Sequence, residues 1–308
     1  MMNNDPHTPQ SDLWSDWLLR LRHGNDPEYE RLVRARIERF VDRVLDGAQL
    51  APGMTLVDVG TGDGILAFRA IDRIGPSLRV LLTDISIPML RHAEKVAMQK
   101  GVSDQCTFIH NPTEHLTDID ESSADVVTTR AVLAYIHDKK NTLEEFYRVL
   151  KPGGRISIAE PLLRDEAIQA CALKKYVDSK PKDSPDRFLS LMHRLRAAQF
   201  PDTKEKLLTS SLTNYTERDL LRFVLDAGFE EVHMEFHVDV IPSIITSWEV
   251  FLGSSPHPWA PTPGAIFAEQ FTEEERQLFE RIYRPGIEAG LYSATERVVY
   301  ITGRKPLT

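Results

Sequence analysis

Apolar and polar positions alternate with two distinct periods along the central part of the chain. Between residues 54 and 160, five short apolar runs are separated by stretches in which apolar residues recur every three or four positions. The runs are typical of buried strands and the stretches of amphipathic helices. This β-α alternation predicts an α/β fold, a parallel sheet with helices on both faces. The predicted strands are 55–59, 79–83, 106–110, 124–129 and 155–159, and the predicted helices are 66–74, 87–99 and 140–150.

The first fifty residues have a helical pattern. Asp26 is a good N-cap, and Pro27 suits the first turn of a long helix. An apolar stripe follows, and the helix is expected to end near Gly47. A shorter amphipathic piece with Trp14 and Trp17 comes before it. We therefore expect a helical extension ahead of the sheet.

Two later segments interrupt the alternation. Residues 161–215 are mostly helical by composition, and residues 242–295 combine a proline-rich stretch with helical sequence. Between them, Thr216 caps a helix that leads into a strand at 231–241, and a last strand follows at 297–303. The predicted organisation is an N-terminal helical extension (1–50), an α/β core (51–160, 216–241 and 296–308) and helical insertions that form a substrate lid (161–215 and 242–295).

Composition narrows the function classes. The 308 residues are 42% hydrophobic and 27% charged, which is ordinary for a globular protein. No apolar run approaches the roughly 20 residues that span a bilayer, and no signal peptide is evident, so we expect a cytoplasmic protein with no membrane partner. The net charge of −9 argues against a nucleic-acid partner, which requires a basic surface. Two cysteines suggest no disulfide framework, and no Cys/His spacing suggests a metal site.

The strongest chemical signal is the sequence Asp-Val-Gly-Thr-Gly-Asp-Gly-Ile at residues 58–65. It joins the first predicted strand to a helix, where glycines let the backbone approach a ligand closely. A dinucleotide loop would read Gly-x-Gly-x-x-Gly, but Ile65 stands at its last position and Asp63 would repel a pyrophosphate. A ligand with a cationic, amino-acid-like end fits better, and Asp58 is placed at the strand end to receive it.

Asp84 closes the second predicted strand, 20 residues after Gly64. A carboxylate offers two acceptors in one plane, so it can accept both hydroxyls of a ribose. An exposed acid at a strand end is the plain alternative. The combination with the glycine loop favours the ligand interpretation.

These motifs resemble those of the class I S-adenosylmethionine-dependent methyltransferases. Asp84-Ile85-Ser86 is similar to the second motif, in which the acid holds the ribose and the apolar residue packs on adenine. Residues 112–114 match the segment that flanks the adenine amine, and residues 130–133 match the segment beneath the methionine part. Residues 148–155 match a structural motif before the fifth strand.

The resemblance covers about residues 50–160, together with the last helix and two strands. It implies a Rossmann-like sheet of seven strands, with the last strand antiparallel and inserted between the fifth and the sixth. It also implies S-adenosyl-L-methionine as the cofactor. The residues that it assigns to cofactor binding are Asp58, Gly60, Thr61, Gly62, Asp84, Ile85, Thr113, Glu114 and Arg130.

Methyl transfer from a sulfonium needs an in-line nucleophile, and a base only where that nucleophile must lose a proton. Three residues are candidates for a catalytic role: His137, Glu160 and Tyr29. His137 is placed to take a proton, although a surface histidine beside Asp138 is the simpler interpretation. Glu160 either faces the substrate or bonds locally. Tyr29 either folds over the cofactor or packs as an ordinary helix residue, and Arg130 pairs with a pocket acid or with the cofactor carboxylate.

The extension and the insertions are expected to build the substrate pocket. Residues 174–206 hold nine Lys/Arg and five Asp/Glu, which either steer an anionic substrate or form a solvated helical face. The second insertion is rich in aromatic residues, which suits a flat small molecule, an ordinary core or a homodimer contact. These aromatic residues are Trp248, Phe251, Trp259, Phe267 and Phe271.

The preferred hypothesis is a small-molecule methyltransferase, acting on oxygen or nitrogen in secondary metabolism. An RNA or protein methyltransferase is disfavoured by the acidic balance and the lack of an appended binding domain. A non-catalytic module that binds S-adenosylmethionine stays open. A nicotinamide oxidoreductase is disfavoured by the glycine spacing.

Overall fold

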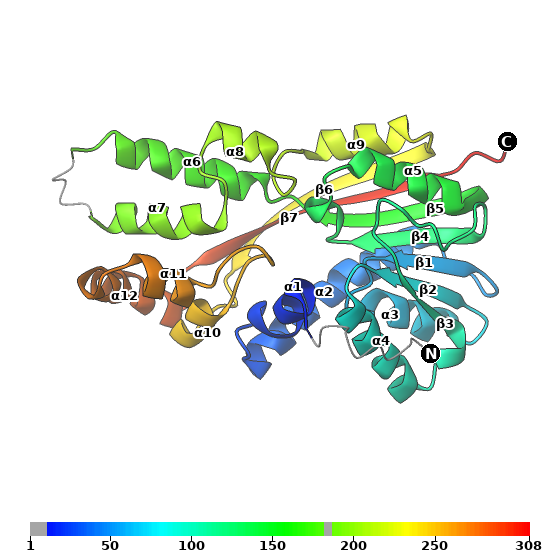
Figure 1. Cartoon of the computed structure of the whole chain (residues 1–308), viewed down its shortest axis with the longest axis horizontal. Helices are drawn as coiled ribbons and strands as arrows, with labels where there is room; N and C mark the ends of the chain where they lie inside the picture. The colour runs from blue at the N-terminus through cyan, green and yellow to red at the C-terminus, as the bar shows by residue number, and fades with distance from the viewer. Residues whose placement is uncertain (1–10, 182–186) are drawn as a thin grey trace.

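The computed structural model describes residues 11–181 and 187–308, which are built around a seven-stranded sheet (Figure 1). The strands are β1 (Thr55–Val59), β2 (Arg79–Asp84), β3 (Cys106–His110), β4 (Ala124–Arg130), β5 (Leu150–Pro161), β6 (Glu230–Pro242) and β7 (Ser293–Arg304). Their order is β3-β2-β1-β4-β5-β7-β6. β7 is antiparallel to β5 and β6, and the other pairs are parallel. The predicted sheet, with its last strand inserted between the fifth and the sixth, is confirmed.

Helices cover both faces of this sheet, as β-α alternation requires. On one face, α2 (Pro27–Ala48), α3 (Ile65–Ile74) and α4 (Ile87–Lys100) share an apolar core with β1 and β2. On the other face, α5 (Lys139–Val149) and α9 (Glu217–Asp226) pack against β4, β5 and β7. The carboxyl ends of β1, β2 and β4 are thus held on a rigid platform. Two 3₁₀ turns complete the core, η2 (Ser103–Gln105) and η3 (Leu133–Tyr135).

The helix ends follow local sequence signals. Thr216, the predicted cap, forms a capping box, and so does Thr272 at the start of α12 (Glu273–Glu288). Gly47 lies near the end of α2, as predicted; the helix ends at Ala48, with Gln49 in the left-handed conformation. A Cβ atom on Gly47 would lie 2.8 Å from Oγ of Ser157. This glycine therefore serves close packing of α2 on β5 rather than helix termination.

The two insertions fold together at one end of the sheet, on the left in Figure 1. Side chains of α7, α10, α11 and α12 share an apolar core, which contains four of the five aromatic residues singled out in the second insertion. Trp259 is the exception and is 46% exposed. The insertion helices are α6 (Arg164–Asp178), α7 (Arg187–Gln199), α8 (Lys204–Thr209), α10 (Trp248–Gly253), α11 (Pro263–Gln270) and α12 (Glu273–Glu288).

An N-terminal segment, residues 11–25, precedes α2. It contains the short helix α1 (Leu13–Asp16) and a π-helical turn, η1 (Trp17–Leu21). The indole N–H of Trp17 donates to the carbonyl of Ser255 at 3.1 Å. The amide of Ser255 donates in turn to the carbonyl of Leu21 at 2.7 Å. These bonds tie the N-terminal segment to the second insertion. The predicted helical content of residues 1–10 lies outside the described residues.

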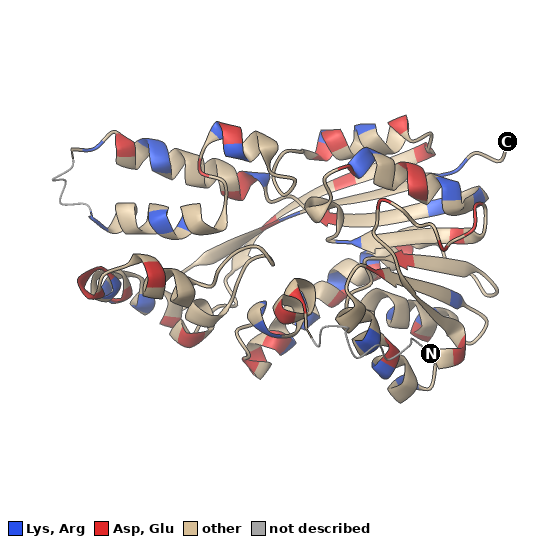
Figure 2. Ribbon diagram, viewed as in Figure 1, with Lys and Arg blue, Asp and Glu red and all other residues tan. Residues whose placement is uncertain are grey.

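Charged side chains of both signs are interspersed over the insertion helices (Figure 2). Within the basic stretch 174–206, of which residues 182–186 lie outside the described chain, five cations form ion pairs with acids. Paired cations steer a distant anion weakly, so the structure favours the solvated-face interpretation. These cations are Lys174, Arg187, Arg194, Arg196 and Lys206.

Over residues 11–181 and 187–308, no helix is both long enough and apolar enough to cross a membrane. In the same ranges, no group of three or more His, Cys, Asp or Glu side chains has the arrangement of a metal site. Cys106 and Cys171 are both half-buried free thiols.

Candidate functional site

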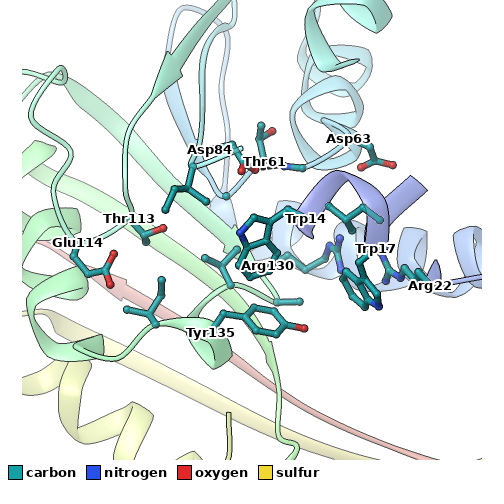
Figure 3. Close-up of a pocket in the computed structure, with 17 residues that line it drawn as sticks. Trp14, Trp17, Arg22, Thr61, Asp63, Asp84, Thr113, Glu114, Arg130 and Tyr135 are labelled. Atoms are coloured by element: carbon teal, nitrogen blue, oxygen red, sulfur yellow. Dashed lines mark hydrogen bonds between the residues drawn. The ribbon is translucent and has the colours of Figure 1, made fainter. Parts of the chain in front are cut away.

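A cavity lies at the carboxyl ends of β1, β2 and β4, beneath the N-terminal segment (Figure 3). Its empty volume is about 970 Å³, including the open mouth. All the predicted cofactor-binding residues except Asp58 line this cavity. They are Gly60, Thr61, Gly62, Asp84, Ile85, Thr113, Glu114 and Arg130.

The glycine loop forms the floor of the cavity because its backbone adopts conformations that other residues rarely take. Gly60 and Gly62 have φ angles of +65° and +56°. A Cβ atom on Gly60 would lie 2.4 Å from Cγ2 of Val132, which is an impossible contact. A Cβ atom on Gly62 would lie 3.5 Å from Cδ1 of Leu18, a residue of the cavity wall. The bare loop therefore keeps open the space between β1 and the N-terminal segment.

Asp84 fixes the glycine loop and faces the cavity. Its two carboxylate oxygens accept the backbone N–H groups of Gly62 and Ser86, each at 2.9 Å. Burial raises the pKa of Asp84, and these hydrogen bonds oppose the rise. Each oxygen retains a second lone pair. Asp84 can thus hold the loop and still accept two hydroxyl groups of a ligand.

Asp58 has a different place from the one expected. The prediction was direct contact with a cationic ligand group, but Asp58 is 2% exposed and does not line the cavity. Its carboxylate accepts the hydroxyls of Thr61 at 2.7 Å and Thr128 at 3.0 Å. Burial raises its pKa to about 6 despite these bonds. Asp58 therefore ties the glycine loop to β4, because both of its oxygens are directed to these hydroxyls.

Glu160 does not face the substrate. It is fully buried, and its two oxygens accept the backbone N–H groups of Val132 at 2.9 Å and Ala134 at 3.3 Å. Of the two interpretations of Glu160, local bonding is the correct one. Val132 lines the cavity, so Glu160 is a positioning residue for the loop after β4. Burial raises the pKa of Glu160 to about 7.

His137 and Tyr29 also lie outside the cavity lining. His137 is exposed, and the neighbouring Asp138 caps α5 by accepting the N–H of Asn141 at 3.0 Å. The surface interpretation of His137 is thus the one that the structure favours. Tyr29 is half-buried in the first turn of α2. His137 lines a neighbouring hollow that shares Ile85 and Glu114 with the cavity, so a catalytic role for either side chain stays a prediction.

One wall of the cavity comes from the N-terminal segment, which contributes Trp14, Trp17, Leu18 and Arg22. We expected the extension to help build the substrate pocket, but Tyr29 was the residue singled out there. The sequence signal was present in the two tryptophans, but an amphipathic pattern alone does not reveal what a helix covers. No residue in the described part of 161–215 lines this cavity, and a substrate lid formed by the insertions stays a prediction.

Three aromatic rings connect this wall to the rest of the molecule. Trp14 packs edge-on against Tyr135 with ring centroids 5.1 Å apart. Tyr135 packs edge-on against Trp259 of the second insertion at 5.4 Å. The second insertion thus acts indirectly, by supporting the wall that the N-terminal segment provides.

The raised pKa of Glu160 predicts a pH-dependent contribution to stability. At pH values between the ordinary pKa of a glutamate and the raised pKa of about 7, Glu160 is protonated in the folded protein but ionised in the unfolded chain. The unfolding free energy therefore falls as the pH rises through this range. We expect the wild type to lose about 2 kcal/mol of unfolding free energy from this group between pH 5.5 and 7.5. Glu160→Gln should lose that dependence. Urea unfolding at pH 5.5 and pH 7.5 measures this change in unfolding free energy. The same change in the wild type and in Glu160→Gln would contradict a raised pKa at Glu160.

The chain matches a known family and known proteins. Residues 50–207, which are 158 of the 308, match the family described as methyltransferase domain. The tRNA 5-carboxymethoxyuridine methyltransferase of Escherichia coli (strain K12) is 33% identical over 129 residues, 42% of this chain and 48% of that protein. The ubiquinone/menaquinone biosynthesis C-methyltransferase UbiE of Brucella anthropi is 27% identical over 199 residues, 65% and 72% of the two chains. The match to the first relative thus spans about half its length.

Solved structures share the fold at low sequence identity. The YcgJ protein from Bacillus subtilis superposes with a TM-score of 0.55 at 17% identity, over 87% of this chain and 99% of that one. The [4+2]-cyclase SpnF superposes with a TM-score of 0.51 at 19% identity, over 88% of this chain and 82% of that one. The family match over half the chain, together with this fold, decides the assignment. The chain belongs to the methyltransferase domain family, within the class I S-adenosylmethionine-dependent methyltransferases.

Proposed function

We propose that this protein transfers a methyl group from S-adenosyl-L-methionine to an oxygen or nitrogen atom of a small molecule, in secondary metabolism. The observation that carries the proposal is the cavity itself. Its floor joins the bare glycine loop to Asp84, and its wall is aromatic, with Trp14, Trp17 and Tyr135. Enclosed apolar walls with a few polar groups suit a small organic molecule.

The residues of the cavity fit the cofactor of this family. Asp84 keeps free lone pairs for ribose hydroxyls, and the 53% exposed side chain of Ile85 offers an apolar surface for adenine. Thr113 and Glu114 lie together on one side of the cavity, where they would contact the adenine amine (Figure 3). The glycine loop, which has no side chain at Gly60, leaves space for the methionine part of the cofactor. When bound, the cofactor supplies an electrophilic methyl group on a sulfonium.

The protein's own contribution is alignment and exclusion of water. Among the described residues, three acids line the cavity: Asp63, Asp84 and Glu114. Asp63 lies 3.5 Å from the guanidinium of Arg34, and Asp84 accepts the N–H of Gly62 while it keeps lone pairs for a ligand. Burial raises the pKa of Tyr135, so its phenol stays protonated and can donate a hydrogen bond to the acceptor. Alignment of an already nucleophilic atom can supply most of the acceleration.

A tRNA acceptor is the second candidate, because the relative named as a tRNA methyltransferase is 33% identical. The net charge of −9 weighs against it, as does a cavity wall that a nucleotide within a polymer would have to displace. The fold alone does not establish methyl transfer, because one solved neighbour is named as a cyclase. The test must therefore measure both cofactor binding and methyl transfer.

Thermal unfolding with S-adenosylhomocysteine, and with NADH in parallel, tests the cofactor. At 100 times its dissociation constant, a ligand adds roughly 2.7 kcal/mol, or about 5–10 °C for a chain of this size. Incorporation of a radiolabelled methyl group into a panel of phenols and amines, and into unmodified tRNA, tests the acceptor. Stabilisation by S-adenosylhomocysteine with labelling of a small molecule is the expected result. Labelling of tRNA alone would favour the second candidate, and stabilisation by NADH alone would refute the cofactor.

Gly60→Ala tests the loop directly. The variant combines left-handed strain of roughly 1–2 kcal/mol with a clash against Val132, so we expect S-adenosylhomocysteine affinity to fall by about 10- to 100-fold. Gly53→Ala is the matched control, because Gly53 has φ +83° and nothing within 4 Å of its built Cβ. Isothermal titration should show nearly unchanged affinity in the control. An equal loss of S-adenosylhomocysteine affinity in both variants would mean that backbone strain, and not the clash at Gly60, weakens binding.

A further inference from the structure

Two guanidinium groups lie in the cavity without a partner. Arg22 comes from the N-terminal segment and Arg130 from the end of β4, and both line the cavity on the side where Trp17 lies (Figure 3). In the part of the chain that the structure describes, neither side chain donates a hydrogen bond or forms an ion pair. Each guanidinium carries five N–H donors, and buried donors are nearly always satisfied. Both side chains line the cavity, so a ligand bound there can reach them.

Three acids, Asp63, Asp84 and Glu114, line the cavity, but among the described residues none forms an ion pair with Arg22 or Arg130. Burial and the charge of Arg130 together lower the pKa of Arg22 to about 10. Asp63 opposes this effect, but it already lies 3.5 Å from Arg34. Two close guanidinium groups in a partly buried site are unfavourable unless an anion lies between or beside them.

The cofactor cannot pair with both guanidinium groups. S-adenosylmethionine carries one carboxylate and two positive centres, the ammonium and the sulfonium. Its single carboxylate can pair with at most one of the two guanidinium groups. With the cofactor in place, the other guanidinium group is thus left for a second anion.

The surroundings of Arg22 define what the missing anion is attached to. Its Cζ atom lies over the Trp17 ring, 5.2 Å from the centroid, so the guanidinium is held in a fixed plane. Trp14 and Tyr135 continue the same wall as an edge-on pair. A planar guanidinium suits a carboxylate, which it can bind through two parallel hydrogen bonds. The adjoining rings suit an aromatic body.

We propose that Arg22 binds the carboxylate of the methyl acceptor, so that the acceptor is an aromatic carboxylic acid. Arg130, at the end of β4, is left to bind the carboxylate of the cofactor. The inference rests on the proposed function and specifies its substrate class. It also gives the N-terminal segment a role in selecting the acceptor, in addition to closing the cavity.

The test compares aromatic acids with their amides, which have the same shape without the charge. Benzoate, phenylacetate, indole-3-acetate and 1-naphthoate, each beside its amide, are titrated into protein saturated with S-adenosylhomocysteine. We expect at least one acid to bind about 10- to 100-fold more tightly than its amide, the range for a charge-assisted hydrogen-bond pair. Arg22→Gln should abolish this preference, and Arg22→Lys should restore part of it.

The matched control is Arg20→Gln, because Arg20 lies two residues before Arg22, in the π-helical turn, but is exposed and paired with Asp16. It should keep the preference for the acid. S-adenosylhomocysteine affinity should stay within about threefold in both glutamine variants, which shows that they are folded and that the cofactor site is intact. Equal binding of acids and amides, no binding of any acid, or a preference that survives Arg22→Gln would overturn the proposal. Failure of the wild type to bind S-adenosylhomocysteine would instead refute the proposed function.

Discussion

Replacing Asp84 by alanine is expected to weaken S-adenosylhomocysteine binding by about 100- to 1000-fold. The carboxylate holds the glycine loop through the N–H of Gly62 and begins α4 through the N–H of Ser86. We also propose that it accepts the ribose hydroxyls of the cofactor. Hydrogen bonds to a charged group are worth roughly 1.5–3 kcal/mol each, so losing two from the ligand gives an effect of this size. Isothermal titration with S-adenosylhomocysteine measures it.

The fold of this variant should survive. Burial raises the pKa of Asp84, so the charged side chain is not a source of net stability at its own position. Asp104→Ala is the control, because Asp104 is an exposed acid of η2 on the same half of the sheet. It should bind S-adenosylhomocysteine as the wild type does. Unchanged affinity in Asp84→Ala, with a normal unfolding midpoint, would remove Asp84 from the cofactor site.

The sheet could be predicted because its central strands are buried on both faces. β1 and β3 have the predicted bounds, and β2 and β4 each extend one residue further. β7 begins four residues earlier than predicted, at Ser293. Its outer part is half-exposed and carries polar residues such as Glu296, because there it leaves the core and runs out to the insertions with β6. Apolar patterning marks only the part of a strand that lies in a core.

The cofactor side of the cavity was also predictable, since its residues all follow strands that end at one edge of the sheet. The roles of acids at those ends were not. Asp58 and Glu160 both end or nearly end a strand in an apolar run, yet both turn inward to bind hydroxyl or backbone groups. Which way such a side chain points depends on contacts with distant residues, such as Thr128, 70 positions from Asp58, and Val132, 28 positions from Glu160. A single sequence contains no signal for them.

The opposite wall could not be assigned for the same reason. The bond from Trp17 to Ser255 joins residues 238 positions apart. Hydrophobic patterning predicted that the two tryptophans pack on something, but not that they close a cavity built by the glycine loop. The consequence is functional. The segment that covers the cavity is anchored by a few contacts to an insertion, rather than being part of the core.

Trp17→Ala is therefore expected to release the N-terminal segment while leaving the sheet intact. Trp17 is 9% exposed, and truncating a buried tryptophan costs about 3–5 kcal/mol, more than so short a segment can lose and stay docked. Hydrogen exchange should show residues 11–25 losing protection and the strands of the sheet keeping theirs. Because the segment covers the cavity, we expect S-adenosylhomocysteine to dissociate about 10- to 100-fold faster. Tryptophan fluorescence in stopped flow can follow this release, because Trp14 lines the cavity.

Leu19→Ala is the matched control for this release, because Leu19 belongs to the same π-helical turn but is 38% exposed. Its truncation removes apolar surface without breaking the bond to Ser255, so both exchange protection and the dissociation rate should stay close to those of the wild type. The two readouts separate the possible causes. Faster dissociation with full protection of residues 11–25 would assign Trp17 a direct contact with the ligand. Lost protection with an unchanged dissociation rate would mean that the N-terminal segment covers the cavity without retaining what is bound there.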